Sequence, residues 1–163
     1  KGLKLFADFQ EFLVSKLGFE TKANLVGMSW GGFFSIRYTN SYPQNVRRIY
    51  LDAPLLNFQE WNGDDPAKVG PWASMQPADG LWENDPRMPV NMAESIAKAG
   101  IPIKLLYGGQ DQTVNPKLNC EPFIERFKAT GGKAVVECRG GFGHHPHGVD
   151  PNKTEAITGF FKN

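Results

Sequence analysis

Apolar residues recur along this chain with two alternating spacings. Between 3 and 17 they stand three or four positions apart and stop at Gly18, which is typical of an amphipathic helix with a glycine cap. Short apolar runs of strand length occur at 25–28, 46–51, 103–107 and 134–138. Stretches with helical spacing lie between or after them, at 32–42, 91–99, 116–130 and 152–161. Strands separated by helices predict an α/β fold: one domain over 1–163, with a mostly parallel sheet and helices on both faces.

The stretch 54–89 interrupts this alternation. It is rich in Gly, Pro, Asp, Asn and Trp and is too long for an ordinary connection, so it predicts an irregular active-site loop or a small lid. Trp61, Trp72 and Trp82 lie within it. They fit an aromatic platform for a sugar ring, or they simply anchor the loop to the core.

Composition excludes several classes of function. With 163 residues and 40% hydrophobic content the chain can bury a core, and no apolar run approaches the roughly 18 residues of a membrane span. A net charge of +1 from mixed charges argues against a nucleic-acid or anionic-membrane surface and favours a small-molecule partner. Cys120 and Cys138 match no zinc motif, and we expect two buried free thiols. The chain starts at Lys1, which is compatible with a removed leader, so export in a bacterium is one expectation and the compartment stays open.

The most informative motif is the pentad Gly27-Met28-Ser29-Trp30-Gly31, placed between a predicted strand and a predicted helix. It matches the nucleophile elbow, a sharp turn that lifts a serine hydroxyl above the sheet. We expect a side chain at either flanking glycine to collide with the strand or the helix. A phosphate-binding interpretation fails because the P-loop lysine and the third glycine of a dinucleotide turn are missing.

An acid and a histidine follow Ser29 in a specific order, Asp111 and then His144. Ser, Asp, His is the chain order of the α/β-hydrolase triad, and each residue follows a predicted strand, where reacting groups gather in parallel sheets. His144 is predicted to take the Ser29 proton, Asp111 to orient the imidazole, and the Trp30 N–H to donate to the oxyanion. Asp52 is the alternative acid and His145 the alternative histidine.

Other polar residues near these positions allow further interpretations. His144, His145 and His147 suggest zinc, but neighbouring histidines point apart and no carboxylate or cysteine has matching spacing, so neither a metal nor a cofactor is expected. Asn119 and Glu121, shortly after the acid, either line a pocket or cap a helix.

Three segments carry a more specific likeness, 49–54 (IYLDAP), 119–121 (NCE) and 143–148 (GHHPHG). With the triad they resemble a group of bacterial carbohydrate-esterase-like α/β-hydrolases, over nearly the whole chain. The resemblance implies an esterase that removes a small acyl group, such as acetyl, from a carbohydrate. It departs at Trp30, where many relatives have a basic residue.

The same resemblance covers only the C-terminal part of the hydrolase fold, because one helix alone precedes the nucleophile strand. We therefore expect a fragment or processed chain, with an unpaired sheet edge that binds the remaining N-terminal segment of the same protein. The second oxyanion donor normally lies in that segment. A noncatalytic hydrolase-like domain or inactive fragment is thus the main alternative to an esterase. A peptidase is a weaker alternative, because the sequence shows no gating domain.

Overall fold

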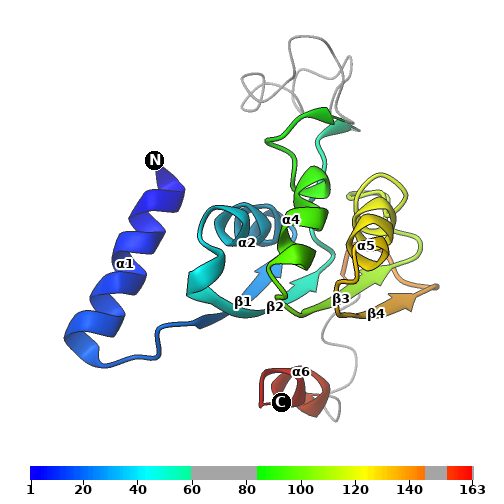
Figure 1. The fold of residues 1–163 in the computed structure, drawn as a ribbon. Coiled ribbons are helices and arrows are strands. Elements are labelled where there is room, and N and C mark those ends of the chain that lie inside the picture. Colours follow the sequence, from blue (N-terminus) through cyan, green and yellow to red (C-terminus); the bar gives the residue numbers. More distant parts are fainter. Residues whose placement is uncertain (60–83, 146–153, 163) are drawn as a thin grey trace.

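The computed structural model describes residues 1–59, 84–145 and 154–162. Figure 1 shows its elements, which are α1 (Gly2–Leu17), β1 (Ala23–Met28), α2 (Trp30–Ser41), η1 (Pro43–Asn45), β2 (Val46–Asp52), η5 (Pro89–Met92), α4 (Ala93–Lys98), β3 (Ile103–Gly108), α5 (Cys120–Ala129), β4 (Ala134–Arg139) and α6 (Thr154–Lys162). Most of the predicted stretch 54–89, with its three tryptophans, lies outside the described residues.

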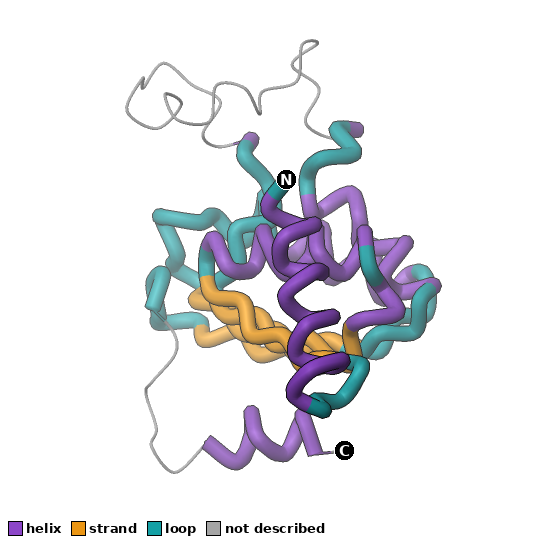
Figure 2. Tube along the Cα trace, turned by 90° about the vertical axis from the view of Figure 1, so that its left-hand side faces the viewer, coloured by secondary structure: helices purple, strands orange, loops and turns teal. Residues whose placement is uncertain are grey.

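The four strands form one parallel sheet in the order β1-β2-β3-β4. Successive strands are added on the same side, and right-handed crossovers then place the connecting helices α2, α4 and α5 on one face of the sheet. Helix α6 lies on the opposite face (Figures 1 and 2). The predicted α/β fold is therefore confirmed, including the parallel sheet and the helices on both faces.

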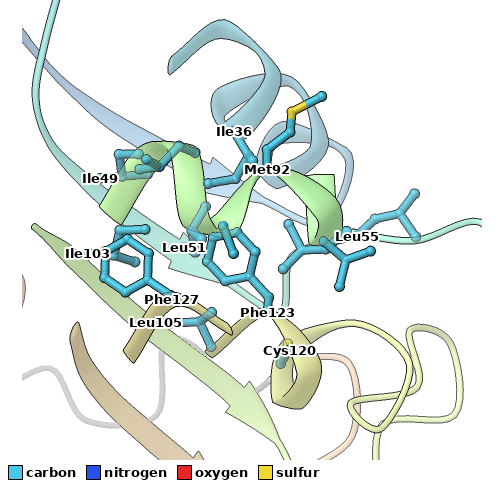
Figure 3. Close-up of a cluster of buried hydrophobic side chains, with 14 of the residues drawn as sticks. Ile36, Ile49, Leu51, Leu55, Met92, Ile103, Leu105, Cys120, Phe123 and Phe127 are labelled. Carbon is cyan, nitrogen blue, oxygen red and sulfur yellow. The ribbon is translucent and has the colours of Figure 1, made fainter. Parts of the chain in front are cut away.

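The main core fills the space between the sheet and the three connecting helices. Figure 3 shows this cluster, in which Leu51 and Leu105 from the sheet face Phe123 and Phe127 from α5. These four side chains are almost completely buried. Burial of each contributes roughly 1.5–3 kcal/mol, so the sheet holds the loops at its carboxyl edge on a rigid base.

Gly18 and Gly131 lie just after the helices that they are predicted to end, whereas the largest difference at a helix start is that of α5. Gly18 ends α1 with φ of 70°, its N–H donates to the Val14 carbonyl, and the Phe19 N–H donates to the Leu13 carbonyl. Helix α5 begins at Cys120, four residues later than the sequence pattern indicates, because the preceding residues form a separate turn. In that turn the Asn115 side chain accepts the Lys117 N–H at 3.0 Å.

Strand β1 is not the buried strand that its apolar run predicts. In the sheet of the described residues it is an edge strand, and its side chains alternate between the helix-covered face and an open face. On the open face Val26 and Met28 are 64% and 51% exposed. An apolar run alone does not distinguish a central strand from an edge strand that is covered on one side.

Helix α1 lies beside α2 at the β1 side of the molecule (Figure 1). Phe6 packs edge-on against Phe34 and Tyr38, whereas Phe9 and Phe12 are about half exposed. Its buried residue is polar: the Gln10 amide donates to two backbone carbonyls and accepts from the Tyr38 hydroxyl at 2.8 Å. A buried hydrogen-bond network therefore fixes α1 in place.

The two thiols differ from the expectation in one respect. Both cysteines are free, but only Cys120 is buried, whereas Cys138 on β4 is exposed. Burial raises the pKa of the Cys120 thiol well above its usual value, so this thiol stays protonated. In the part of the chain that the structure describes, no helix is long and apolar enough to cross a bilayer.

Candidate active site

The strand-to-helix turn at Ser29 has the strained backbone that a nucleophile elbow requires. Ser29 has φ of 47° and ψ of −114°, a region that glycine dominates. Its N–H bonds the Asp52 carbonyl at 3.0 Å, and its own carbonyl accepts the N–H groups of Gly32 and Leu55 at 2.9 Å each. Three backbone hydrogen bonds from two segments thus hold Ser29 in this conformation.

The glycine requirement differs from the prediction at one of the two flanking positions. A Cβ at Gly27 would lie 2.6 Å from the Gly31 carbonyl oxygen, as predicted. At Gly31 a Cβ would meet nothing within 4 Å, so the predicted collision there is wrong. The second tight position is Gly32, where a Cβ would lie 2.3 Å from the Pro54 Cβ.

Ser29, His144 and Asp111 form a continuous hydrogen-bonded chain at the carboxyl edge of the sheet. The His144 Nε2 lies 3.1 Å from the Ser29 Oγ, and the Nδ1 lies 2.8 Å from the Asp111 Oδ2. With the neutral ring protonated at Nδ1, Nε2 is the acceptor for the serine hydroxyl. This arrangement can remove the serine proton and stabilise the imidazolium that forms.

The Asp111 carboxylate is held by its own loop. Its Oδ1 accepts the N–H groups of Thr113 and Val114 at 2.8 Å each, which leaves Oδ2 directed at His144. The Asp111 side chain is only 1% exposed, and that of His144 is 14% exposed. Because the carboxylate is buried, little water competes for its hydrogen bond to His144.

The histidine loop packs directly on the acid loop. The Gln110 N–H bonds the Phe142 carbonyl at 2.9 Å, and the space where Gly108 would carry a Cβ holds the Gly143 carbonyl oxygen at 2.0 Å. Any side chain at Gly108 would push the histidine loop away. Gly108 therefore permits the close approach that brings His144 to Asp111.

Asp52, the alternative acid, lies elsewhere. It ends β2, is buried, and accepts a hydrogen bond from the Tyr50 hydroxyl at 3.3 Å. Burial first, and then the Asp52 charge, raise the pKa of Tyr50, so its hydroxyl stays a donor. The structure brings Asp111 to His144, and it places Asp52 beneath the elbow through the backbone bond to Ser29.

The other predicted site residues lie at different places around the triad. His145, the alternative histidine, is exposed, and its ring centre lies 5.2 Å from that of His144. Trp30 is the first residue of α2, and its ring packs against Phe33 and Phe58. Glu121 is exposed on the first turn of α5.

Asn119 lies at the N-cap position of α5, as the capping alternative predicts, but its side chain makes no cap hydrogen bond. It is fully buried, and its amide is engaged by backbone groups, so the predicted pocket-lining role does not fit it. Trp61, Trp72, Trp82 and His147 lie outside the described residues. Among the described residues, no group of three His, Cys, Asp or Glu side chains could hold a metal ion.

Comparison with known proteins agrees with this geometry at the level of the fold. A model of the alpha/beta hydrolase fold matches residues 4–75. The chain has the α/β-hydrolase fold. Its sheet and its Ser-Asp-His order are those of this fold. No curated protein sequence matches the chain significantly.

Solved α/β-hydrolase structures resemble the chain over most of its length at low identity. Acylaminoacyl peptidase from Pyrococcus horikoshii aligns with a TM-score of 0.71 and 12% identity, over 98% of this chain and 27% of that chain. A puromycin-hydrolysing peptidase from Mycobacterium tuberculosis gives 0.63 and 18%, over 83% and 21%. An α/β-hydrolase enzyme from a Moroccan lagoon sediment metagenome gives 0.56 and 18%, over 98% and 69%. The chain thus spans about a quarter of the length of the two peptidases.

Proposed function

We propose that the chain is a serine hydrolase that cleaves carboxylic esters through an acyl-enzyme on Ser29. The observation that carries this proposal is the relay from Ser29 Oγ through His144 to Asp111, with links of 3.1 and 2.8 Å. His144 takes the hydroxyl proton as Oγ attacks the ester carbonyl, and it returns that proton to the departing alcohol. Water, deprotonated by the same imidazole, then hydrolyses the acyl-enzyme.

The negative charge on the carbonyl oxygen needs hydrogen-bond donors. The Trp30 N–H, at the N-terminus of α2, is the first, and loss of one such donor typically costs roughly 3 kcal/mol of transition-state stabilisation. The α/β-hydrolase fold takes its second donor from a loop that follows an earlier strand, and β1 is the first strand among the described residues.

For the substrate, we propose a small acyl ester of a carbohydrate, such as an acetyl ester. The resemblance to carbohydrate-esterase-like hydrolases supports this substrate class. The rings of Trp30, Phe33 and Phe58 pack against one another in an apolar cluster that starts at the residue after the nucleophile, with Phe58 buried in it. Apolar surroundings next to the nucleophile suit an uncharged acyl group.

A peptidase is the second candidate, and several of the similar structures support it equally. They include an acylaminoacyl peptidase and a puromycin-hydrolysing peptidase. The same relay attacks amides and esters, and protonation of the leaving amine by His144 is the additional demand of amide cleavage. Substrate preference therefore decides between the two activities.

The test is labelling with a serine-directed fluorophosphonate, followed by substrate comparison. We expect the wild type to be labelled, Ser29→Ala to be silent, and Ser41→Ala, which removes an exposed serine at the end of α2, to be labelled normally. Hydrolysis of p-nitrophenyl acetate ahead of the butyrate and octanoate supports a small acyl pocket. Cleavage of acetylalanine p-nitroanilide that is faster than hydrolysis of the p-nitrophenyl esters indicates a peptidase. A wild type that is not labelled refutes the hydrolase and favours the noncatalytic alternative.

A further inference from the structure

Asn119 joins two loops that are far apart in the sequence. Its Oδ1 accepts the N–H groups of Leu56 and Asn57, both at 2.8 Å, and its Nδ2 donates to the Asn115 carbonyl at 3.0 Å. The residue has no exposed surface. Nearby, the Asn57 Nδ2 donates to the Leu118 carbonyl at 3.2 Å. The segment after β2 is thus fastened to the end of the acid loop.

The segment that Asn119 holds also supports the nucleophile elbow. The Leu55 N–H bonds the Ser29 carbonyl at 2.9 Å, and Pro54 occupies the space that a side chain at Gly32 would need. A shift of residues 54–57 would therefore move a direct hydrogen-bond partner of the nucleophile.

The other end of the link belongs to the loop of the catalytic acid. From Asp111 to Asn119 the chain forms consecutive turns, in which Asp111 Oδ1 accepts the Val114 N–H and the Asn115 carbonyl accepts the Asn119 N–H at 3.1 Å. Val114 is almost fully buried, which fixes the middle of this loop. A closed circuit then runs from Ser29 through His144, Asp111 and Asn119 back to the elbow.

We propose that Asn119 is a positioning residue that sets the separation between the Ser29 elbow and the Asp111–His144 pair. Its side-chain oxygen is the shared acceptor for two buried N–H groups, so its removal leaves both without that partner and releases residues 54–57 from the acid loop. This role rests on the proposed hydrolase function. It predicts an effect on the reactivity of Ser29 that exceeds the effect on folding.

The test compares three variants with the wild type. Asn119→Ala removes the acceptor, and Asn119→Asp keeps an acceptor oxygen for both N–H groups. Thr39→Ala is the matched control, because Thr39 is also fully buried and bonds the Ser35 carbonyl within α2, away from the triad. The readouts are the second-order rate of fluorophosphonate labelling and the thermal midpoint of unfolding.

We expect labelling of Asn119→Ala to slow by about 100-fold, the size of effect that a misplacement of about 1 Å can produce. Asn119→Asp should recover most of that rate even where its thermal midpoint stays low, and Thr39→Ala should lose thermal stability with an unchanged rate. Labelling rates that follow only the folded fraction in all three variants would overturn the proposal.

A second readout keeps the failure of this proposal distinct from failure of the hydrolase proposal. The downfield proton resonance of the His144 Nδ1–H responds to both ring contacts, with Asp111 and with Ser29, and needs no turnover. We expect the resonance to shift or broaden in Asn119→Ala and to be unchanged in Thr39→Ala. If the wild type does not react with fluorophosphonate, the proposed function fails, and this comparison still decides the role of Asn119. An unchanged resonance in Asn119→Ala contradicts that role.

Discussion

Gly31 and Gly32 stand side by side at the start of α2, yet alanine at these two positions should have opposite effects. A Cβ at Gly31 meets nothing within 4 Å. A Cβ at Gly32 would lie 2.3 Å from the Pro54 Cβ and 2.9 Å from its Cα. The second contact is to backbone, so it cannot be relieved by rotation of a side chain.

The expected magnitudes follow from two contributions. Alanine is favoured over glycine within a helix by about 1 kcal/mol, and this gain applies to both positions. Overpacking costs about 1–3 kcal/mol, and a contact as short as that at Gly32 belongs at the upper end. Gly31→Ala should therefore stabilise the fold by about 1 kcal/mol and Gly32→Ala should destabilise it by about 2 kcal/mol, a difference of about 3 kcal/mol.

Urea unfolding followed by circular dichroism measures the free energy of unfolding of both variants. The rate of fluorophosphonate labelling measures the reactivity of Ser29 in the elbow. Gly32→Ala displaces the segment whose Leu55 N–H bonds the Ser29 carbonyl, so its labelling should slow, whereas Gly31→Ala should react at the wild-type rate. Equal destabilisation by the two substitutions would refute this reasoning. So would a stable and fully reactive Gly32→Ala.

Three further predictions concern the acid, the pH dependence and the sheet edge. Asp111→Asn should lower kcat for p-nitrophenyl acetate by about 10⁴-fold while Asp52→Asn keeps most of it, and the reverse order would make Asp52 the acid. The hydrogen bonds from Arg87 hold the pKa of Asp85 below its usual value, so this pair stabilises the fold above about pH 4 and the contribution is lost as the pH falls through the lowered pKa. Urea unfolding between pH 2.5 and 7 should thus show a shallower acid loss in Arg87→Met, and identical slopes would contradict this ion-pair contribution. The exposed β1 strand predicts self-association in solution, which light scattering measures. Val26→Lys should reduce it without loss of stability, whereas Val26→Thr should not, and scattering unaffected by the charge would exclude this strand as the contact.

The periodicity of apolar residues was enough to predict the α/β fold, because each strand and helix has its own local spacing. It did not show which strand lies at an edge. Leu25, Val26 and Met28 form an apolar run like that of any central strand, but no described strand pairs with the outer side of β1. Strand order is a property of the whole sheet, and one segment does not encode it.

The candidate site also combines features that local sequence predicts with features that only the whole fold determines. Asp52 and Asp111 both end or follow a strand, and local sequence leaves the choice between them open. The sheet order explains the observed pairing, because β4, which leads to His144, lies beside β3 and therefore beside the Asp111 loop. Asn119 was ambiguous for a related reason. Its partners Leu56 and Asn57 are 63 and 62 residues away in the sequence, so no local pattern predicts these contacts.

The backbone of Ser29 has one more consequence. With φ of 47° and ψ of −114° it is in a region where any side chain is strained, at a typical cost of about 1–3 kcal/mol. Glycine adopts such angles freely. Under the proposed hydrolase function, this strain is the energetic cost of holding the Ser29 hydroxyl 3.1 Å from His144.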